Sequence, residues 1–345
     1  MSREQKIVAG ISLGDINGIG IEVILKTFSD KRMFDFCTPV LFGSFKVISD
    51  HKKALNIEQH VHGIDSLNKV VDRKLNICNI WKDDVQVEIG KSNKNGGKYA
   101  YKSLDAATNA LIKGTIDVLV TAPINKETIQ SDDFNFSGHT EYLDRKLDGK
   151  SLMILMSKSF RIGLITGHIA ISKIAETISS ELIESKVNIL HHSLIKDFNI
   201  NKPKIAILGL NPHNGDKGVI GTEDDELIRP TINKIKETGK LVFGPYAADG
   251  FFGSKTYEQF DGILAMYHDQ GLAPFKALSF GNGVNFTAGL NKIRTSPDHG
   301  TAFDLAGKGH ANFESFKEAL FTAVKIFKNR AEYTELTQNV LASKH

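Results

Sequence analysis

Three histidines stand directly after apolar, strand-like runs, each beside a glycine or a turn-forming pair: His168, His213 and His268. In open α/β sheets, ligand sites form beyond the carboxyl ends of the strands, so these side chains could meet although the sequence separates them widely. Three neutral imidazoles suit a divalent ion such as zinc and leave positions open for substrate oxygens. The alternative is that each imidazole hydrogen bonds to its own loop, which is the commoner role of a single histidine after a strand.

Two cations and an amide lie in segments that are otherwise short of charge. Lys276 and Arg294 stand on either side of Asn285. Fixed cations with an amide donor suit a phosphate or a carboxylate, whereas most lysines and arginines are solvated surface residues. The position of Arg294 between Ile293 and the uncharged run 295–297 favours a binding role for it.

A fourth histidine lies in the segment Ser137-Gly138-His139-Thr140-Glu141, which is typical of a loop that enters a helix. Ser137 or Thr140 could cap that helix. Loops carry much of a protein's chemistry, which favours a binding role for His139. The alternative is that His139 only marks the start of the helix.

Two glycine-containing turns could hold a nucleotide. One is the acidic loop His299-Gly300-Thr301-Ala302-Phe303-Asp304. The other is Gly18-Ile19-Gly20, which lies between a predicted strand and a predicted helix, as in dinucleotide-binding motifs. Val23 stands where the third glycine of GxGxxG would be, and no ribose-binding acid follows a second strand, so that motif is disfavoured.

The elements that must position these residues alternate between strands and helices. Apolar runs predict strands at 7–13, 39–43, 116–120, 151–156, 161–165, 204–210, 240–243 and 262–266. Apolar residues at helical spacing predict helices that start near 21 and cover 96–114, 171–177, 180–196, 224–237 and 312–330. The polar segment 51–95 is predicted to be irregular. This alternation predicts an α/β fold with a mostly parallel sheet.

The composition is that of a globular protein. Of 345 residues, 41% are apolar and 24% are charged, which excludes the disordered and fibrous classes. The net charge is +3 and no block of lysine and arginine occurs, so we expect no nucleic-acid partner. Because the N-terminus is polar and no apolar run approaches the ~20 residues of a membrane span, we expect no membrane association and a cytoplasmic location.

Cysteine and serine chemistry is poorly supported. Cys37 and Cys78 stand in no CxxC spacing, which argues against a disulfide framework or a thiolate metal site and favours a reducing compartment. Neither cysteine has a histidine neighbour, and the sequence has no GxSxG, so a cysteine or serine nucleophile is disfavoured.

Six motifs, in order, resemble those of the 4-hydroxythreonine-4-phosphate dehydrogenases, a family of pyridoxal phosphate biosynthesis. They are Gly14-Asp15 with Gly18-Ile19-Gly20 and Glu22, Thr121-Ala122-Pro123-Ile124-Asn125-Lys126-Glu127, Ser137-Gly138-His139-Thr140-Glu141, Leu210-Asn211-Pro212-His213, Tyr267-His268-Asp269-Gln270-Gly271-Leu272, and Asp298-His299-Gly300-Thr301-Ala302 with Ala306-Gly307-Lys308-Gly309. The resemblance covers nearly the whole chain. It implies an isocitrate/isopropylmalate dehydrogenase-like fold, with two intertwined α/β lobes around a central cleft. We expect residues 1–130 with 270–345 to form the nucleotide-side lobe, and 131–269 the metal and dimerisation lobe.

The resemblance also assigns roles to individual residues. It implies that one divalent metal ion, zinc, magnesium or cobalt, is bound by His168, His213 and His268. It implies that a phosphorylated substrate is contacted by His139, Thr140, Lys276, Asn285 and Arg294. A homodimer with the active site at the subunit interface is implied as well.

A second resemblance concerns the cofactor. The residues His299, Gly300, Thr301, Ala302 and Asp304 resemble the adenosine-binding loop of isopropylmalate dehydrogenases. In that loop the aspartate holds the ribose hydroxyls. A carboxylate there would repel a 2′-phosphate, so we predict NAD as the cofactor, with NADP as the alternative.

The reaction implied is the oxidation of the C3 hydroxyl of 4-(phosphooxy)-L-threonine by hydride transfer to the nicotinamide. Loss of carbon dioxide from the resulting keto acid would give 3-amino-2-oxopropyl phosphate. Candidates for taking the hydroxyl proton are Lys126, Asp249 and Asp269.

The substrate stays open at this point because the sequence departs from the family pattern. Ile16 and Ile21 stand where the glycine turn usually has prolines, and Asp216 stands where glutamate is common. A related dehydrogenase of another phosphorylated hydroxy acid, such as 4-phosphothreonate, is one alternative. A non-catalytic metal- and nucleotide-binding protein is another.

Overall fold

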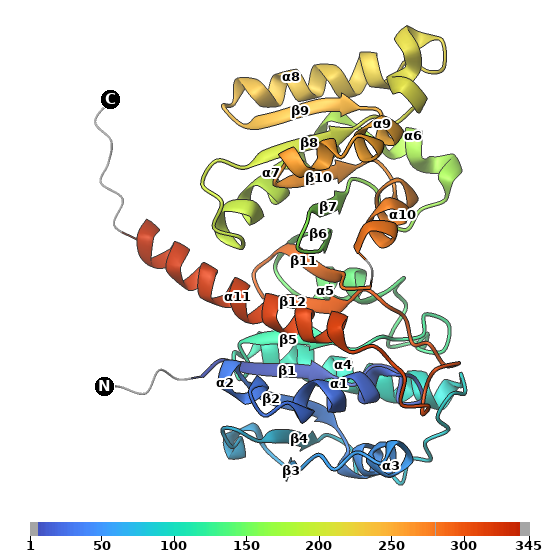
Figure 1. Ribbon diagram of the computed structural model, residues 1–345, viewed down its shortest axis with the longest axis vertical. Helices are drawn as coiled ribbons and strands as arrows, with labels where there is room; N and C mark the ends of the chain where they lie inside the picture. The colour runs from blue at the N-terminus through green and yellow to red at the C-terminus, as the bar shows by residue number, and fades with distance from the viewer. Residues whose placement is uncertain (1–5, 280, 339–345) are drawn as a thin grey trace. The chain divides into compact units, whose positions relative to one another are not determined.

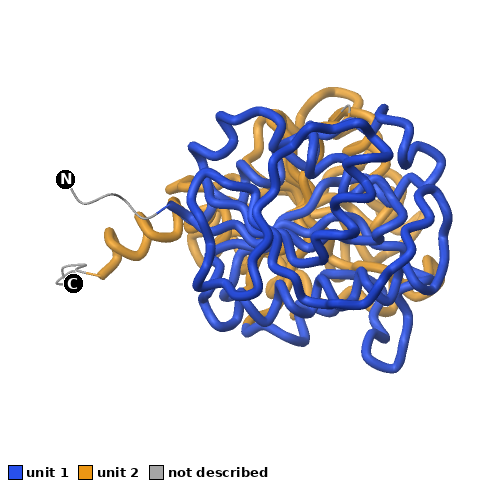
Figure 2. Tube along the Cα trace, turned by 90° about the horizontal axis from the view of Figure 1, so that it is seen from below, with its two compact units in different colours: residues 1–148, 291–327 blue, residues 149–290, 328–345 orange. Residues whose placement is uncertain are grey.

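The computed structural model describes residues 6–279 and 281–338, which form two compact units (Figure 2). The described part of unit 1 comprises residues 6–148 and 291–327, and that of unit 2 comprises 149–290 and 328–338. Among these residues, no helix has the length and apolar character needed to cross a membrane. Cys37 and Cys78 are buried and form no disulfide.

The strands of unit 1 pair in parallel (Figure 1). Their order in space is β3 (Val61–Ile64), β4 (Leu75–Asn79), β2 (Thr38–Gly43), β1 (Val8–Ser12), β5 (Val118–Thr121) and β12 (Arg294–Pro297). All residues of β2, β5 and β12 are buried, as expected for a parallel sheet that is covered on both faces.

The helices of unit 1 follow their strands in the chain. They are α1 (Gly20–Ser29), α2 (Met33–Phe36), α3 (Phe45–Leu55), the 3₁₀ turn η1 (Leu67–Lys69), α4 (Lys94–Ile112) and α5 (His139–Lys146). The helix α11 (Glu314–Thr337) begins in unit 1 and ends in unit 2. The helix α4 contacts β1, β2 and β5, and its predicted apolar stripe Ala100, Leu104, Ala107 and Leu111 is buried.

Unit 2 combines antiparallel and parallel strands. Their order is β11 (Val284–Leu290), β6 (Gly149–Met156), β7 (Arg161–Leu164), β10 (Gly262–Ala265), β8 (Lys204–Leu208) and β9 (Leu241–Tyr246). The pairs β11–β6 and β6–β7 are antiparallel, and the neighbours from β7 to β9 are parallel. The carboxyl ends of β7, β10, β8 and β9 therefore share one edge of the sheet.

The helical segments of unit 2 are η2 (Ile171–Lys173), α6 (Ile174–Thr177), α7 (Ser180–Lys196), η3 (Pro212–Gly218), the π-helical turn η4 (Asp224–Ile228), α8 (Arg229–Glu237), α9 (Ala248–Gly253), η5 (Thr256–Gln259) and α10 (His268–Ser279). The helix α8 contacts β9, and α10 contacts β7 and β10. A buried core of aliphatic and aromatic side chains lies under the parallel strands and includes Leu164, Leu208, Ala265 and Phe275.

The predicted α/β class with a mostly parallel sheet is confirmed, and several predicted elements need correction. The helix 180–196 has the predicted bounds. The segment 51–95 is not irregular throughout, because it contains β3 and β4. The helix α5 has Gly138 as its N-cap, and neither Ser137 nor Thr140 caps it with a side chain.

The division into units differs from the lobes that we expected. The boundaries lie at 148/149 and 290/291, whereas we expected 130/131 and 269/270. The first boundary is later because α5 is fixed to unit 1 by Tyr142, which stacks on Phe134 and donates a hydrogen bond to Asp105. The second is later because β11 pairs with β6 of unit 2.

Candidate active site

The parallel strands of unit 2 place the three predicted metal ligands at one edge of the sheet. His168 follows β7, His268 follows β10 and His213 follows β8. Because β10 lies between β7 and β8, the chain order of the histidines differs from their order in space. The pairing of the strands thus brings together loops that the sequence separates.

His168 and His268 lie close to each other. Their ring centroids are 5.2 Å apart and the ring planes are inclined by 44°. His268 is the first residue of α10, and its Nδ1 lies 2.7 Å from Oδ1 of Asp269. Within residues 6–279 and 281–338, no three His, Cys, Asp or Glu side chains cluster closely enough to hold a metal ion. The three-histidine site therefore stays a prediction.

Hydrogen bonds between neighbouring loops fix the positions of these histidines. Thr166, two residues before His168, donates through its hydroxyl to the carbonyl of Met266 at 2.6 Å. Gln270 accepts from the Met266 N–H at 2.7 Å and donates to the carbonyl of Gly209 at 2.6 Å. The loops after β7, β10 and β8 are therefore tied to one another.

The loop that carries His213 has an unusual backbone. His213, Asn214, Asp216 and Lys217 have φ between +45° and +56°, in the left-handed region. For residues other than glycine this conformation costs roughly 1–2 kcal/mol each. Such strain persists only where the surroundings impose it, and it is frequent at functional sites.

Asp224 is the residue that holds this strained loop. Its buried carboxylate accepts hydrogen bonds from the backbone N–H groups of Leu210 and Asn211, at 2.8 and 2.9 Å. The side chain of Asn211 donates to Asp224 at 3.1 Å and to Glu223 at 2.8 Å. The side chain of Asn214 donates to the carbonyl of Pro245 at 3.0 Å. The first part of the loop, from Leu210 to Asn214, is therefore anchored to its surroundings.

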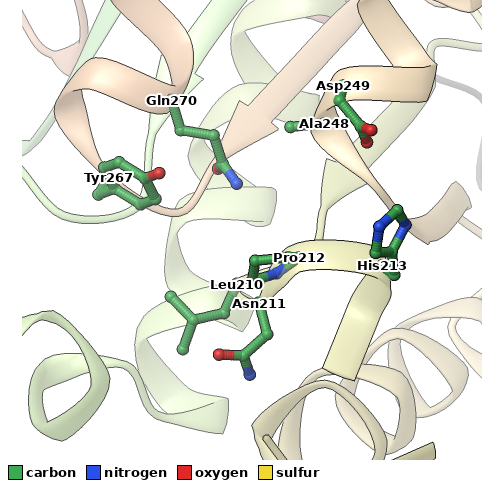
Figure 3. Close-up of a pocket in the computed structure, with 8 residues that line it drawn as sticks. All are labelled: Leu210, Asn211, Pro212, His213, Ala248, Asp249, Tyr267 and Gln270. Carbon is green, nitrogen blue, oxygen red and sulfur yellow. The ribbon is translucent and has the colours of Figure 1, made fainter. Parts of the chain in front are cut away.

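Side chains from three loops line a hollow of about 310 Å³ at this edge (Figure 3). They are Leu210, Asn211, Pro212 and His213 after β8, Ala248 and Asp249 after β9, and Tyr267 and Gln270 after β10. Asp249 is exposed and lies in the first turn of α9. Of the three proton-transfer candidates, Asp249 is the one that lines the hollow together with a predicted metal ligand.

In unit 1, the structure buries Arg294 in β12, where its side chain is 2% exposed. Its Nε and Nη2 donate to the hydroxyl of Thr121, at 3.1 and 2.6 Å. Burial lowers the pKa of Arg294 to about 9, which the charge of Glu141 partly opposes. Arg294 is therefore a fixed cation at neutral pH.

His139 lies at the start of α5 in the electrostatic field of two cations. Burial, with Arg294 and Lys126 acting in the same direction, lowers the pKa of His139 well below its usual value. Its Nε2 is enclosed and has no hydrogen-bond partner. The structure thus brings His139 together with Arg294 and Lys126, as an arrangement suited to an anion.

The other predicted substrate contacts are spread over both units. Thr140 follows His139 in α5 and is half-buried. In unit 2, Lys276 is exposed on α10. Asn285 lies in β11 opposite Leu155 of β6, and its Oδ1 is enclosed without a hydrogen-bond partner.

The predicted nucleotide loop is held by the glycine turn of unit 1. The N–H of Ile19 donates to the carbonyl of Thr301 at 3.0 Å. A Cβ on Gly18 would lie 2.9 Å from that same oxygen, so glycine is required there. Ala302 has a φ of +40°. Asp304 is exposed, so its carboxylate is accessible to a ligand from solvent.

Sequence reasoning assigned no role to the side chains that hold this turn in place. Asp15 is fully buried and accepts from the N–H of Asn17 at 3.0 Å. Burial raises its pKa, which the Asn17 N–H and the Thr128 hydroxyl partly oppose. Asn17 in turn accepts from the N–H of Glu88 at 2.8 Å, and His51 Nε2 lies 2.7 Å from the carbonyl of Ile16. In the sequence, the one signal for these side chains was the presence of an acid, Asp15, in a glycine-containing turn.

Comparisons with known proteins agree on one family. The family model described as "Pyridoxal phosphate biosynthetic protein PdxA" matches residues 35–323. A 4-hydroxythreonine-4-phosphate dehydrogenase of Bacteroides thetaiotaomicron is 52% identical over 95% of this chain and 90% of the relative. A protein of the same name from Sulfurihydrogenibium sp. is 39% identical over 93% of this chain and 98% of the relative.

A solved structure agrees with them. The crystal structure of 4-hydroxythreonine-4-phosphate dehydrogenase from Klebsiella pneumoniae superposes with a TM-score of 0.81 and 30% identity, over 95% of this chain and 99% of that one. This likeness confirms the predicted dehydrogenase-like α/β fold. The matches extend along nearly the whole chain, and the protein therefore belongs to the PdxA family of pyridoxal phosphate biosynthesis.

Proposed function

We propose that this protein oxidises 4-(phosphooxy)-L-threonine with NAD and releases carbon dioxide, giving 3-amino-2-oxopropyl phosphate. The observation that carries the proposal is the 52% identity, along 95% of the chain, to a 4-hydroxythreonine-4-phosphate dehydrogenase. The site geometry agrees with it, because imidazoles and a carboxylate gather at one sheet edge while a buried cation lies in unit 1.

One divalent metal ion, zinc, magnesium or cobalt, would be held by His168, His213 and His268. The chemistry of the donor set fits, since imidazoles bind such ions well, and the ring centroids of His168 and His268 lie 5.2 Å apart. When bound, the ion would lower the pKa of the substrate hydroxyl and polarise the carbonyl that forms from it. Asp269 would orient His268 through the contact at Nδ1.

The remaining residues bind the substrate and move its proton. Arg294 and Lys276 would anchor the phosphate, so that binding energy from a non-reacting group orients the hydroxyl. Asn285 would donate a side-chain hydrogen bond to the substrate. Because Asp269 already contacts His268 and Lys126 faces His139, Asp249 is the strongest candidate for the proton acceptor.

The loop His299 to Asp304 would bind the adenosine part of NAD. Its position is fixed by Gly18 and Ile19, so a nucleotide would meet a preformed surface. The exposed carboxylate of Asp304 could accept hydrogen bonds from both ribose hydroxyls and would repel the 2′-phosphate of NADP.

A homodimer with the active site at the subunit interface is part of the proposal. Large apolar side chains are exposed beside the metal ligands: Ile171 is 79% exposed three residues after His168, and Val219 is 82% exposed six residues after His213. Ile169 and Ile220 are exposed next to them. A contiguous exposed apolar patch marks an interface, and these side chains would contribute to one.

The test is the formation of NADH from 4-(phosphooxy)-L-threonine, with and without a chelator. NADH is followed by its absorbance at about 340 nm. We expect turnover that the chelator abolishes and that added zinc, magnesium or cobalt restores. Faster turnover of 4-phosphothreonate would assign the chain to a related reaction. Turnover that resists exhaustive chelation would refute the metal-dependent mechanism.

A further inference from the structure

The charged groups around His139 affect whether its ring is protonated, in the free protein and when an anion is bound. The charged groups that face its ring in unit 1 are Arg294 from β12 and Lys126 from the segment after β5. Glu141, on α5 itself, faces Arg294. The ring therefore lies in a field in which positive charges act on it from two different elements.

The Nε2 atom of His139 is enclosed and unpartnered, although buried polar atoms are satisfied in most proteins. Neighbouring cations and enclosure both disfavour a second positive charge on the ring, so His139 is neutral at pH 7. An anion that accepted a hydrogen bond from this enclosed nitrogen would also meet the charges of Arg294 and Lys126.

We propose that an anion entering this pocket is bound together with one proton, which Nε2 of His139 takes up from solvent. The anion's negative charge reverses the field at the ring and favours the imidazolium. The new N–H then donates to an oxygen of the anion, while Arg294 supplies the fixed positive charge. The bound pocket gains one proton for each dianion, and both ring nitrogens become donors.

This inference rests on the proposed function, in which the anion is the substrate phosphate, and it specifies how that phosphate is recognised. Affinity for a dianion should fall about tenfold for each unit of pH above neutrality, as long as the free ring is neutral and the bound ring is charged. Substrate capture would then be tighter at lower pH, opposite to the trend that deprotonation of the substrate hydroxyl would give.

Isothermal titration calorimetry of the full chain with sodium sulfate tests the proposal. Sulfate is a dianion that does not titrate near neutrality, so any proton taken up on binding is bound by the protein and not by sulfate. The titration is done at about pH 7.5, roughly one unit above the ordinary histidine pKa. We expect the binding enthalpy to vary linearly with the ionisation enthalpy of the buffer. The slope of that line, which counts the protons taken up per sulfate, should be near one.

Two variants locate the proton. His139→Gln retains a side-chain donor but cannot titrate, so it should bind sulfate with a slope near zero and with an affinity that no longer changes with pH. His62→Gln replaces an exposed histidine of β3 and should behave like the natural chain. Circular dichroism spectra should be the same for all three proteins.

Three results would overturn the proposal. The first is sulfate binding by the natural chain without proton uptake, since a neutral Nε2–H tautomer would then be the donor. The second is an unchanged slope in His139→Gln, and the third is the absence of sulfate binding. None of these depends on NADH formation, so a failure of the proposed reaction is distinguished from a failure of this inference.

Discussion

Replacing Arg294 by methionine should weaken substrate binding while stabilising the fold. The side chain is 2% exposed, and burial lowers its pKa to about 9. At about 1.36 kcal/mol per pH unit, holding the charged guanidinium in this site costs on the order of 5 kcal/mol. Methionine fills a similar volume without that cost, although the Thr121 hydroxyl loses two donors at a cost of about 1–3 kcal/mol. We therefore expect a net gain of about 2–4 kcal/mol in unfolding free energy from these two effects.

The kinetic effect has the opposite sign. A hydrogen bond to a charged group contributes about 1.5–3 kcal/mol, so KM for the phosphorylated substrate should rise about 10- to 150-fold. The fall in kcat should be smaller, because the phosphate is remote from the reacting hydroxyl. Steady-state kinetics at saturating NAD and thermal unfolding of the same preparation measure both effects.

A matched control separates burial from function. Arg161 in β7 is also held at a lowered pKa by burial, and it lies 4.6 Å from the ring of Phe198. Arg161→Met should leave KM unchanged. Arg294→Met that unfolds at a lower temperature with an unchanged KM would refute the reasoning, because Arg294 would then be a structural cation.

Four further variants test the rest of the site. His268→Ala should lose bound metal and turnover together while staying folded, which metal analysis and circular dichroism would reveal; retained activity would exclude the three-histidine site. Asp304→Ala should reduce the preference for NAD over NADP, and an unchanged ratio of kcat/KM would mean that the ribose is held elsewhere. Asp224→Asn should weaken metal binding about 10- to 100-fold by loosening the His213 loop, as loss of a supporting residue commonly does; an affinity equal to that of the natural chain would contradict this. The unfolded chain binds a proton at His139 below about pH 6.5 that the folded chain does not, so stability falls as the pH drops below that value. His139→Gln should flatten this fall in urea titrations between roughly pH 6.5 and 5, and an equally steep fall would assign it to another group.

The fold was predictable where hydrophobic periodicity was strong. The buried strands β1 and β8 and the helices α4 and α7 followed from apolar runs or stripes. The strand β12 was not recognised as a strand, because its residues Arg294–Pro297 are mostly polar although all are buried. The edge strand β3 was missed because two of its four residues are exposed. The strand β4 was missed because asparagines interrupt its short apolar run.

The candidate site was predictable only in part. The rule that ligand sites lie beyond the carboxyl ends of parallel strands predicted a shared location for the loops that carry His168, His213 and His268, and the structure places them at one sheet edge. Metal binding there stays a prediction. The pairing order β7, β10, β8 could not be read from the chain, so the proximity of His168 to His268 was open. Residues that act through backbone contacts, such as Asp224, leave no spacing pattern in the sequence.

The places where the structure departs from ordinary local rules coincide with the proposed chemistry. A buried arginine in a strand and a run of left-handed residues around His213 each lower the stability of the fold. An enclosed histidine nitrogen without a partner does the same. An anion would accept hydrogen bonds from the first and the last, and a metal ion would use the second. Because the three costs fall on residues that the sequence singled out for binding, selection for ligand binding explains them better than selection for stability.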